Sequence, residues 1–441
     1  MSATNEISAK VKAAGVVGAG GAGFPTHVKL AAQAEIFIVN GAECEPLLRV
    51  DQQLMARHAE ELVRGLRHGM AATGAKEGIV ALKAKYKPAI AALEPLLPSN
   101  VRLHFLKDIY PAGDEVITIW MATGRRVPPA KRPADIGIMV SNVMSLINVA
   151  HAVDEERPVT LRPVTVTGAV NTPVTVVAPI GTPLAELLAR AGGPARPDVA
   201  YVGGGPMMGH LLHDLNEPVT KTTSAIIALP EDHIVVRRHR QSMQSVLRIA
   251  KTTCEQCLLC TELCPRHLIG HELPPHLIVR SLNYNHVGHP STLLSALTCS
   301  ECAVCEAYAC PVDISPMRIN MALKAQMRAE GLKYEGELRP ADPMAEYRLV
   351  PITRLLQKLA IQQYSVPAPL QDEPLAPAQV VIKLQQHIGA PAQALVREGE
   401  RVAAGQLIGE IPQGSLGARV HASIDGTVTA VTPQAVTIRR Q

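Results

Sequence analysis

The sequence predicts a multidomain protein that combines α/β and α+β domains, and three observations support this prediction. The chain has 441 residues, too many for one hydrophobic core, so we expect three or four domains. A glycine-rich segment near the N-terminus is followed by a helical pattern and an apolar strand, as at the start of an α/β domain. Eight of the nine cysteines lie in two short groups, 254–264 and 299–310, which predicts a separate metal-binding domain.

The composition is that of a soluble globular protein. The chain is 47% hydrophobic and 19% charged, and its net charge is only +4. Few aromatic residues and no concentrated basic stretch argue against a nucleic-acid partner. Residues 1–15 lack the apolar segment of a signal peptide, and the charge-free stretches 136–153 and 163–185 contain too many polar, proline and glycine residues to span a membrane. We expect a cytoplasmic protein without a membrane span.

The glycine-rich segment, "GVVGAGGAGFPTHVKL" at 15–30, is the first candidate binding motif. Gly18, Gly20 and Gly23 satisfy the pattern G-x-G-x-x-G, but the segment before them is helical and Pro25 follows at once. This context does not fit the standard dinucleotide-binding fold. Bare glycine backbone can still approach a flat or phosphorylated ligand closely. The alternative is a turn without a ligand.

Polar side chains follow the first predicted strand, "EIFIVN" at 35–40. Asn40, Glu43 and Glu45 come directly after it, in "NGAECEP". Because α/β folds bind ligands beyond the carboxyl ends of their strands, these groups are candidates to bind ribityl or ribose hydroxyls. The alternative is an acidic surface loop.

The cysteine groups have the spacing of a two-cluster ferredoxin. The first reads C-x2-C-x2-C-x3-C-P and the second C-x2-C-x2-C-x4-C-P. In two-cluster ferredoxins, the fourth cysteine of each group binds the other cluster. This rule pairs Cys264 with the second group and Cys310 with the first. The sequence thus predicts two [4Fe–4S] clusters, with the ligands Cys254, Cys257, Cys260, Cys264, Cys299, Cys302, Cys305 and Cys310.

Structural zinc and a disulfide framework are the alternatives for the cysteine groups. Zinc sites usually have two ligand pairs separated by a longer loop, and disulfides are rare in the cytosol. The four-residue spacing before Cys310 departs from the ferredoxin pattern and leaves its cross-ligation open. The ninth cysteine, Cys44, has no cysteine neighbour in the sequence and is predicted to be a small buried or loop residue.

The remaining sequence predicts further modules. Two strand patterns, a short helix and a third strand within 162–235 suggest a β-grasp module, in which Met207 and Met208 fill the core. The C-terminal segment has two half-repeats with glycine-centred turns and resembles a lipoyl- or biotinyl-type barrel sandwich. Because the last lysine is Lys383, its turns lack the lysine that carries a cofactor.

The predicted limits are 1–158 for the first domain, 159–240 for the β-grasp domain, 241–335 for the ferredoxin-like helical domain, 336–378 for a helix and proline-rich linker, and 379–441 for the barrel sandwich.

Three motifs carry a family resemblance: "GAGGAGFPTHVK", "NGAECEP" and "YPAGDE". They resemble the flavin-binding subunit of respiratory complex I and the C subunit of the Rnf electron-transfer complex. The resemblance implies FMN as cofactor and NADH as substrate. The departures are Ala19, where complex I has arginine, and Ala32, near where it has an aromatic residue for the adenine. The implied binding residues are Gly18, Gly20, Gly21, Gly23, Phe24, Lys29, Asn40, Glu43, Glu45, Tyr110, Gly113, Asp114, Glu115 and Asn142.

The order of the modules is similar to that of the cobalamin reductase family of propanediol-utilisation microcompartments. This resemblance implies electron transfer from NADH through FMN and two [4Fe–4S] clusters to cobalamin. It also implies a location in a bacterial microcompartment, with cob(I)alamin adenosyltransferase and shell proteins as partners. Two alternatives remain: an Rnf-like NADH–ferredoxin or quinone oxidoreductase subunit, and a non-enzymatic electron conduit of a microcompartment shell. Electron transfer from NADH to cobalamin through these cofactors requires no catalytic acid, base or nucleophile of the protein, and none is predicted.

Overall fold

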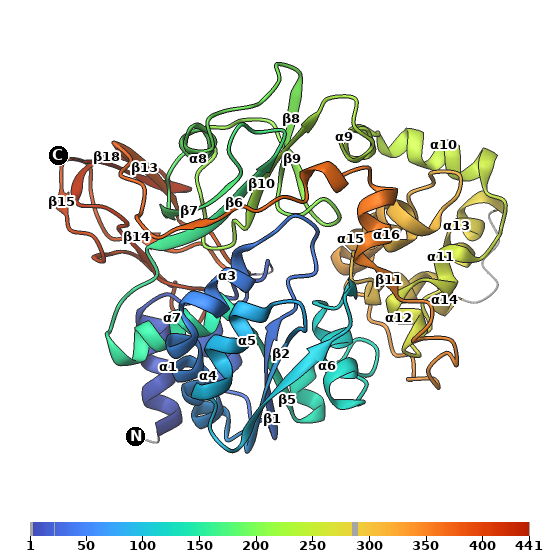
Figure 1. Ribbon diagram of the computed structural model, residues 1–441, viewed down its shortest axis with the longest axis horizontal. Coiled ribbons are helices and arrows are strands. Elements are labelled where there is room, and N and C mark those ends of the chain that lie inside the picture. Colours follow the sequence, from blue (N-terminus) through green and yellow to red (C-terminus); the bar gives the residue numbers. More distant parts are fainter. Residues whose placement is uncertain (1–2, 22, 285–289, 441) are drawn as a thin grey trace.

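The computed structural model describes residues 3–21, 23–284 and 290–440. These residues form an N-terminal α/β domain, a second sheet, a helical cysteine-bearing segment and a C-terminal pair of small sheets (Figure 1). This mixture of α/β and α+β modules confirms the predicted fold class.

The N-terminal domain is built on a four-stranded parallel sheet with the order β3-β2-β1-β5. The strands are β1 (Ile36–Gly41), β2 (Glu77–Lys83), β3 (Val101–Leu106) and β5 (Ile138–Asn142). The central strand β1 is almost wholly apolar because both of its faces are covered. Phe37 and Val39 belong to the hydrophobic core on one face, and Ile36 and Ile38 to the core on the other.

Helices cover both faces of this sheet. The core around Phe37 includes residues of α1 (Ala3–Ala13), α3 (Val50–Arg57), α4 (Ala59–Thr73) and α7 (Val143–Asp154). The core around Ile38 includes residues of α6 (Glu115–Thr123). Two short helices, α2 (Thr26–Leu30) and α5 (Lys87–Leu93), complete the domain. Because all four strands are parallel, the loops that follow β1 and β5 meet at one edge of the sheet, where the candidate site lies.

The second sheet has six strands in the order β12-β7-β6-β10-β8-β9. Its elements are β6 (Leu161–Gly168), β7 (Val174–Pro179), α8 (Leu184–Arg190), β8 (Val199–Gly203), β9 (His210–Leu212) and β10 (Ala225–Pro230). The predicted strand, strand, helix and strand are all present, with β9 as an additional edge strand. Met207 is buried in the core, but Met208 is 55% exposed, so the expectation that both fill the core is wrong for Met208.

Helices surround the cysteine groups. They are α9 (Ile234–Arg240), α10 (Met243–Thr253), α11 (Leu259–Glu262), α12 (Pro265–Leu268), α13 (Pro275–Tyr284), α14 (Pro290–Leu294) and α15 (Pro316–Ala329). Pro265 and Pro316 each lie at the start of a helix, where a missing backbone N–H costs no hydrogen bond. The first cysteine loop follows α10, and the second lies between α14 and α15.

The segment 336–378 joins two other parts of the molecule. Its strand β11 (Val350–Pro351) pairs with β4 (Ile109–Tyr110) of the first domain, and α16 (Ile352–Lys358) follows. Its second strand, β12 (Leu370–Gln371), pairs in parallel with β7 of the second sheet. The sequence indicated a helix and a linker here. It did not predict the two strand pairings, because each strand pairs with a partner more than 190 residues away.

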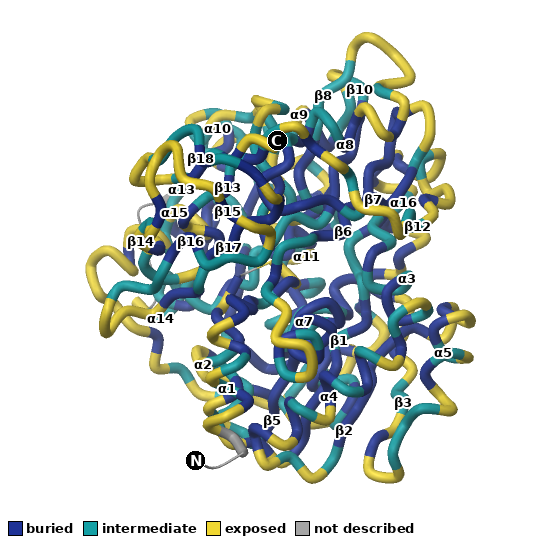
Figure 2. The backbone as a smooth tube through the Cα atoms, turned by 90° about the vertical axis from the view of Figure 1, so that its left-hand side faces the viewer, coloured by how far each residue is buried: buried dark blue, intermediate teal, exposed yellow. Residues whose placement is uncertain are grey.

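The C-terminal module consists of two small sheets, ordered β13-β19-β18-β15 and β14-β16-β17. The strands are β13 (Gln379–Lys383), β14 (Gln393–Ala394), β15 (Arg401–Val402), β16 (Leu407–Glu410), β17 (Val420–His421), β18 (Gly426–Val431) and β19 (Ala435–Arg439). Its apolar residues share one continuous core with helices of the N-terminal domain. In Figure 2 the buried stretches run through the interior, and the exposed stretches lie mostly at turns and loops.

A buried lysine holds this module to the glycine-rich segment. Lys221, only 3% exposed, donates hydrogen bonds from Nζ to the carbonyl oxygens of Gly15 (2.6 Å) and Arg419 (2.7 Å). Burial lowers the pKa of Lys221 to about 7. The contact joins the second sheet, the N-terminal domain and the C-terminal module at one point.

No helix among the described residues is long and apolar enough to cross a lipid bilayer.

The contact between α4 and α7 predicts a strong effect of the substitution Gly65→Ala. A Cβ atom at Gly65 would lie 1.9 Å from the carbonyl oxygen of Leu146, so the two helices would have to move apart. We expect a loss of about 3 kcal/mol in the free energy of unfolding, measured by thermal and denaturant unfolding followed by circular dichroism. Arg67→Ala, at an exposed position of the same helix, should change it by less than about 0.5 kcal/mol. Equal stability of the two variants would contradict this packing.

Candidate functional site

The glycine-rich segment forms a tight loop between α1 and α2. Val17 and Pro25 form an isolated bridge, and the N–H of Gly18 donates to the carbonyl oxygen of Phe24 (2.8 Å). Gly21 has a φ of +124°, which L side chains rarely adopt, and an added Cβ there would have no atom within 4 Å. The loop therefore presents bare backbone to an open space.

Two asparagines lie side by side at the carboxyl ends of β1 and β5, because Asn40 and Asn142 are register partners. Asn40 donates from Nδ2 to the carbonyl oxygen of Gly113 (2.9 Å). Asn142 caps α7 by accepting the N–H of Met144 (2.9 Å), and a Cβ at Gly20 would lie 3.4 Å from its Cβ. The start of a twelve-residue helix thus adjoins the glycine-rich loop, an arrangement that favours an anionic group.

Glu43 is engaged with the start of α3. Its carboxylate accepts hydrogen bonds from the N–H of Asp51 (2.8 Å) and from the Nε2 of Gln52 (2.9 Å). Burial raises the pKa of Glu43, and it raises the pKa of Asp51 to about 7, with a further contribution from the Glu43 charge. Glu43 therefore shapes the loop after β1 through its own contacts.

Three polar residues near the glycine-rich loop were missed by the sequence analysis. Ser145 accepts the N–H of Ala19 (2.8 Å), and Arg162 donates from Nη2 to the carbonyl oxygen of Ala19 (2.9 Å). Asp51 accepts a hydrogen bond from Asn142 Nδ2 (2.7 Å). Burial lowers the pKa of Arg162 to about 10, while the charge of Asp51 opposes this shift. In the sequence, Arg162 stands out as the single charged residue of the strand pattern at 161–168.

Glu45 and Tyr110 connect three parts of the chain. The Glu45 carboxylate accepts hydrogen bonds from the N–H groups of Met207 (3.1 Å) and Met208 (3.0 Å). The hydroxyl of Tyr110 lies 3.2 Å from Glu45 Oε1 and 2.9 Å from the carbonyl oxygen of Cys302, to which it donates. The pKa of Glu45 rises to about 7 because the carboxyl is buried. The predicted binding pocket thus touches the second cysteine group directly.

The segment 110–115 makes a further contact with the cysteine segment. Asp114 caps α6 through Oδ1 and forms an ion pair through Oδ2 with Arg266 Nη2 at 2.8 Å. Both side chains are mostly buried, with exposures of 11% and 13%. The neighbouring Glu115 pairs with Lys29 at 2.8 Å on a more exposed surface. The structure therefore brings Lys29 and Glu115 together, while Phe24 remains 36% exposed.

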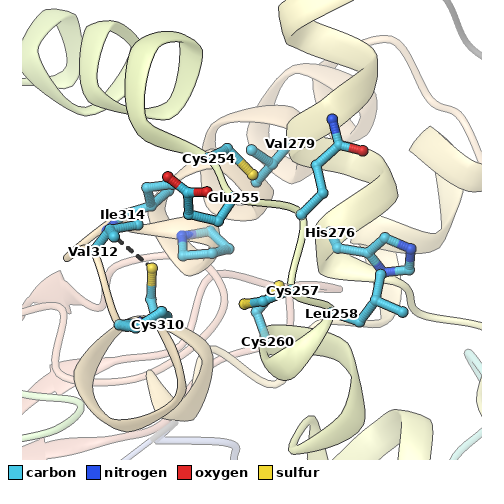
Figure 3. A pocket seen from close by; sticks show the side chains of 13 residues that line it. Cys254, Glu255, Cys257, Leu258, Cys260, His276, Val279, Cys310, Val312 and Ile314 are labelled. Carbon is cyan, nitrogen blue, oxygen red and sulfur yellow. Dashed lines mark hydrogen bonds between the residues drawn. The ribbon is translucent and has the colours of Figure 1, made fainter.

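Cys310 lies with the first cysteine group. The sulfur atoms of Cys254, Cys257, Cys260 and Cys310 face a common space, and the N–H of Ile314 donates to Cys310 Sγ at 3.3 Å (Figure 3). We call these four cysteines the outer set. Burial and then the neighbouring thiols, first of all that of Cys310, raise the pKa of Cys260 to about 12.

Cys264 lies close to the second cysteine group. Burial raises the pKa of Cys264 to about 12, with a contribution from the Cys299 thiol. The Cys264 and Cys299 thiols also raise the pKa values of Cys302 and Cys305, where burial is again the largest cause. We call Cys264, Cys299, Cys302 and Cys305 the inner set. All four inner cysteines are buried, whereas Cys257 of the outer set is exposed.

The two cysteine loops share one backbone conformation. In the first loop, Gln256 and Leu258 flank Cys257 with φ values of 52° and 66°. In the second, Glu301 and Ala303 flank Cys302 with a φ of 61° each. Positive φ is unfavourable for residues other than glycine, and such strain is found at functional sites. The repetition indicates that each loop curls around an object of the same kind.

The surroundings of the inner set fit an iron–sulfur cluster. Arg266 Nε, two residues after Cys264, is buried and has no hydrogen-bond partner among the described residues, and Asn320, which is 1% exposed, lies beside Cys299. Within the described ranges, no three His, Cys, Asp or Glu side chains lie as close together as the ligands of a single metal ion. A cubane carries one iron for each thiolate, so its sulfur ligands stand further apart than those of a single ion.

Four known families match the chain. The matches are the Nuo51 FMN-binding domain at residues 11–151, the SLBB domain at 163–210, the 4Fe-4S dicluster domain at 253–315 and the RnfC barrel sandwich hybrid domain at 360–441. The glycine-rich loop and both asparagines fall in the first match, and all eight grouped cysteines fall in the third. The fold and the site therefore define a flavo-iron–sulfur protein, with an FMN-binding domain joined to a 4Fe-4S domain.

Relatives of known name narrow this class. Cobalamin reductase PduS of Salmonella typhimurium strain LT2 is 58% identical over 99% of this chain and 97% of its own length. The protein of the same name from Citrobacter freundii is 56% identical over 98% and 96%. A more distant relative is the C subunit of the Na(+)-translocating ferredoxin:NAD(+) oxidoreductase complex of Acetobacterium woodii, 35% identical over 59% of this chain and 58% of its own length. The chain belongs to the PduS cobalamin reductase family, as its module order indicated.

The buried Glu45 predicts a pH-dependent stability. The folded carboxyl keeps its proton up to about pH 7, whereas the ordinary pKa of a glutamate exposed to water is 4.5. Between these values the folded state binds more protons, so the free energy of unfolding falls as the pH rises, at most by about 1.4 kcal/mol per pH unit. We expect melting temperatures of Glu45→Gln to fall less between pH 5 and pH 7 than those of the unsubstituted protein. The exposed Glu398→Gln should reproduce the unsubstituted profile, and identical slopes for all three proteins would contradict the prediction.

Proposed function

We propose that this chain is a flavo-iron–sulfur oxidoreductase that transfers electrons from NADH to cobalamin. The contact between the loops after β1 and β4 and the cysteine segment carries this proposal. Tyr110 reaches Cys302, and Asp114 reaches Arg266, so the candidate flavin site and the second cysteine group form one buried region. The likeness to the two cobalamin reductases over nearly the whole chain supports cobalamin as the acceptor.

The proposed cofactors are FMN and two [4Fe–4S] clusters. FMN accepts a hydride and gives up its electrons singly, and iron–sulfur clusters carry one electron at a time. FMN would be held by the amides of Asn40 and Asn142, by the start of α7 and by the backbone of Gly18, Gly20, Gly21 and Gly23. Glu43 and Glu45 would lie beside it, with their carboxylates engaged in the contacts that fix the loop. The outer set and the inner set would each hold one cluster.

The chain's own residues position these groups and shield them from water. Tyr110 is only 1% exposed, and it fixes the Cys302 backbone against the loop that carries Glu45. The Asp114–Arg266 ion pair fixes the segment after Cys264 in the same way. Such rigid support keeps the distance between donor and acceptor groups constant.

NADH would approach over the exposed side of the glycine-rich loop. Phe24 offers an exposed ring there, and Tyr110, Gly113 and Glu115 lie in the neighbouring segment. Ala32 stands where complex I has an aromatic residue, so the adenine contact would differ from that of complex I. Cob(I)alamin adenosyltransferase and microcompartment shell proteins remain the proposed partners, with a microcompartment as the proposed location.

Anaerobic mixing with NADH and cob(III)alamin tests the function. The unsubstituted protein should oxidise NADH, bleach its flavin within the stopped-flow trace and reduce the corrinoid. Cys257→Ser should keep its FMN but lose corrinoid reduction by about a hundred-fold, because one cluster lacks a ligand. Cys44→Ser, which changes a cysteine outside both sets, should leave the iron content unchanged.

Three outcomes would contradict the function. A flavin that stays oxidised after mixing with NADH would support an electron conduit, and stable association with membrane partners would support an Rnf-like subunit. Zinc in place of iron in the purified protein would exclude the clusters.

The open space at Gly21 predicts a specific effect on flavin content. Gly21→Ala and Gly414→Ala each add a methyl group at a positive φ, and neither added Cβ has an atom within 4 Å. The φ values are +124° at Gly21 and +75° at Gly414, so Gly414→Ala controls for a methyl group added in open space at positive φ, and only Gly21 faces the proposed FMN. We expect about ten-fold less FMN per chain in Gly21→Ala and an unchanged content in Gly414→Ala, measured by absorbance after anaerobic purification. Full FMN content in Gly21→Ala would contradict this location of the cofactor.

A further inference from the structure

The inner and outer cysteine sets differ in their contacts with the N-terminal domain. The inner set is tied to it twice, through the hydrogen bond from Tyr110 to Cys302 and through the ion pair of Asp114 with Arg266, two residues after Cys264. Tyr110 and Cys302 also belong to the same hydrophobic core. By contrast, every residue that lines the pocket of the outer set comes from the cysteine segment itself, between 254 and 316.

The two sets also differ in their access to solvent. Residues 255–259, which run through the first cysteine loop, are all exposed, with Leu258 at 41% and Leu259 at 38%. In the second loop, residues 302–307 are all buried. Figure 3 shows Cys257 and Leu258 on the same stretch of the first loop, at the side of the pocket next to His276. An acceptor that stays outside the protein can therefore come close to the outer set, but not to the inner one.

These differences give the electron path a direction. Resting on the proposed function, we propose that electrons pass from the flavin site to the inner set, then to the outer set, and leave at residues 255–259 to reduce cobalamin. One NADH supplies two electrons and a proton. The electrons leave one at a time and reduce two cob(III)alamin molecules to cob(II)alamin, NAD⁺ is formed, and the proton goes to solvent. The rate of electron tunnelling falls steeply with distance. The inner set, in buried contact with Tyr110, is therefore suited to accept electrons from the flavin site, and the outer set, at the exposed first loop, is suited to pass them to cobalamin.

Two substitutions, Cys302→Ser and Cys310→Ser, test the order of the two sets, because the first removes a ligand of the inner set and the second a ligand of the outer set. The two cysteines are buried to the same degree, at 8% and 7% exposure, and both lie in the second group of the sequence, but they belong to different sets in space. Each variant should retain its FMN and about half of the iron. In Cys310→Ser, rapid-freeze EPR after mixing with NADH should show the remaining cluster reduced at the unsubstituted rate. In Cys302→Ser, the remaining cluster should be reduced about a hundred-fold more slowly.

The reverse order of these rates would overturn the proposal, and equal rates would do so as well. This EPR measurement requires no cobalamin, so it decides the order of the clusters even if the unsubstituted protein fails to reduce a corrinoid. Failure of corrinoid reduction with the expected EPR order would count against the acceptor alone.

A second measurement uses the unsubstituted holoprotein and does not depend on the folding of any variant. An iron chelator should remove the two clusters at rates that differ by about ten-fold, with the exposed cluster lost first. Alkylation and mass spectrometry after the first phase should label Cys254, Cys257, Cys260 and Cys310 before the inner set. The half-depleted protein should still show NADH-dependent EPR reduction of its remaining cluster. Prior labelling of the inner set would overturn the proposal.

Discussion

The contact between the Tyr110–Glu115 segment and the cysteine segment is the constraint on which the arrangement of this protein depends. Two groups that exchange electrons must keep a short and constant separation, and a flexible linker could not provide it. Here a buried tyrosine hydroxyl and a mostly buried ion pair fix the two segments. Burial strengthens both interactions. If the contact opened, each polar or charged group would remain buried without its partner, at a cost in free energy. The two segments are therefore expected to stay together throughout turnover.

The neighbouring elements support this contact from several directions. β11 pairs with the strand that carries Tyr110, although the two lie 240 residues apart in the chain. Glu45, which hydrogen-bonds with Tyr110, is itself held by backbone N–H groups of the loop between β8 and β9. A Cβ atom at Gly205 would lie 1.9 Å from the Glu45 carboxylate, so a larger residue there would displace this carboxylate from its hydrogen bonds. The N-terminal domain, the second sheet and the cysteine segment are thus joined by hydrogen bonds through Glu45 and Tyr110.

The C-terminal module supports the opposite side of the candidate flavin site. The carbonyl oxygen of Gly23 accepts the N–H of Ile388, and Lys221 links Gly15 to Arg419. A charged lysine at 3% exposure is costly, and two carbonyl oxygens offset only part of that cost, which agrees with its lowered pKa. The module therefore packs against the glycine-rich loop and holds it in place. This role agrees with the absence of a lysine after Lys383 to carry a cofactor.

Local sequence determined the parts of this protein, and the tertiary structure decided how they meet. The spacing of the cysteines predicted two groups of four, and the apolar strand followed by Asn40 predicted the edge of the first sheet, because spacing and burial pattern are local properties. The sequence did not reveal that Tyr110 reaches Cys302, that Arg162 and Ser145 hold Ala19, or that 336–378 joins two sheets. Those contacts join residues 120 or more positions apart. No local pattern encodes such a pairing, since it exists only once the surrounding cores have placed both partners in the same buried space.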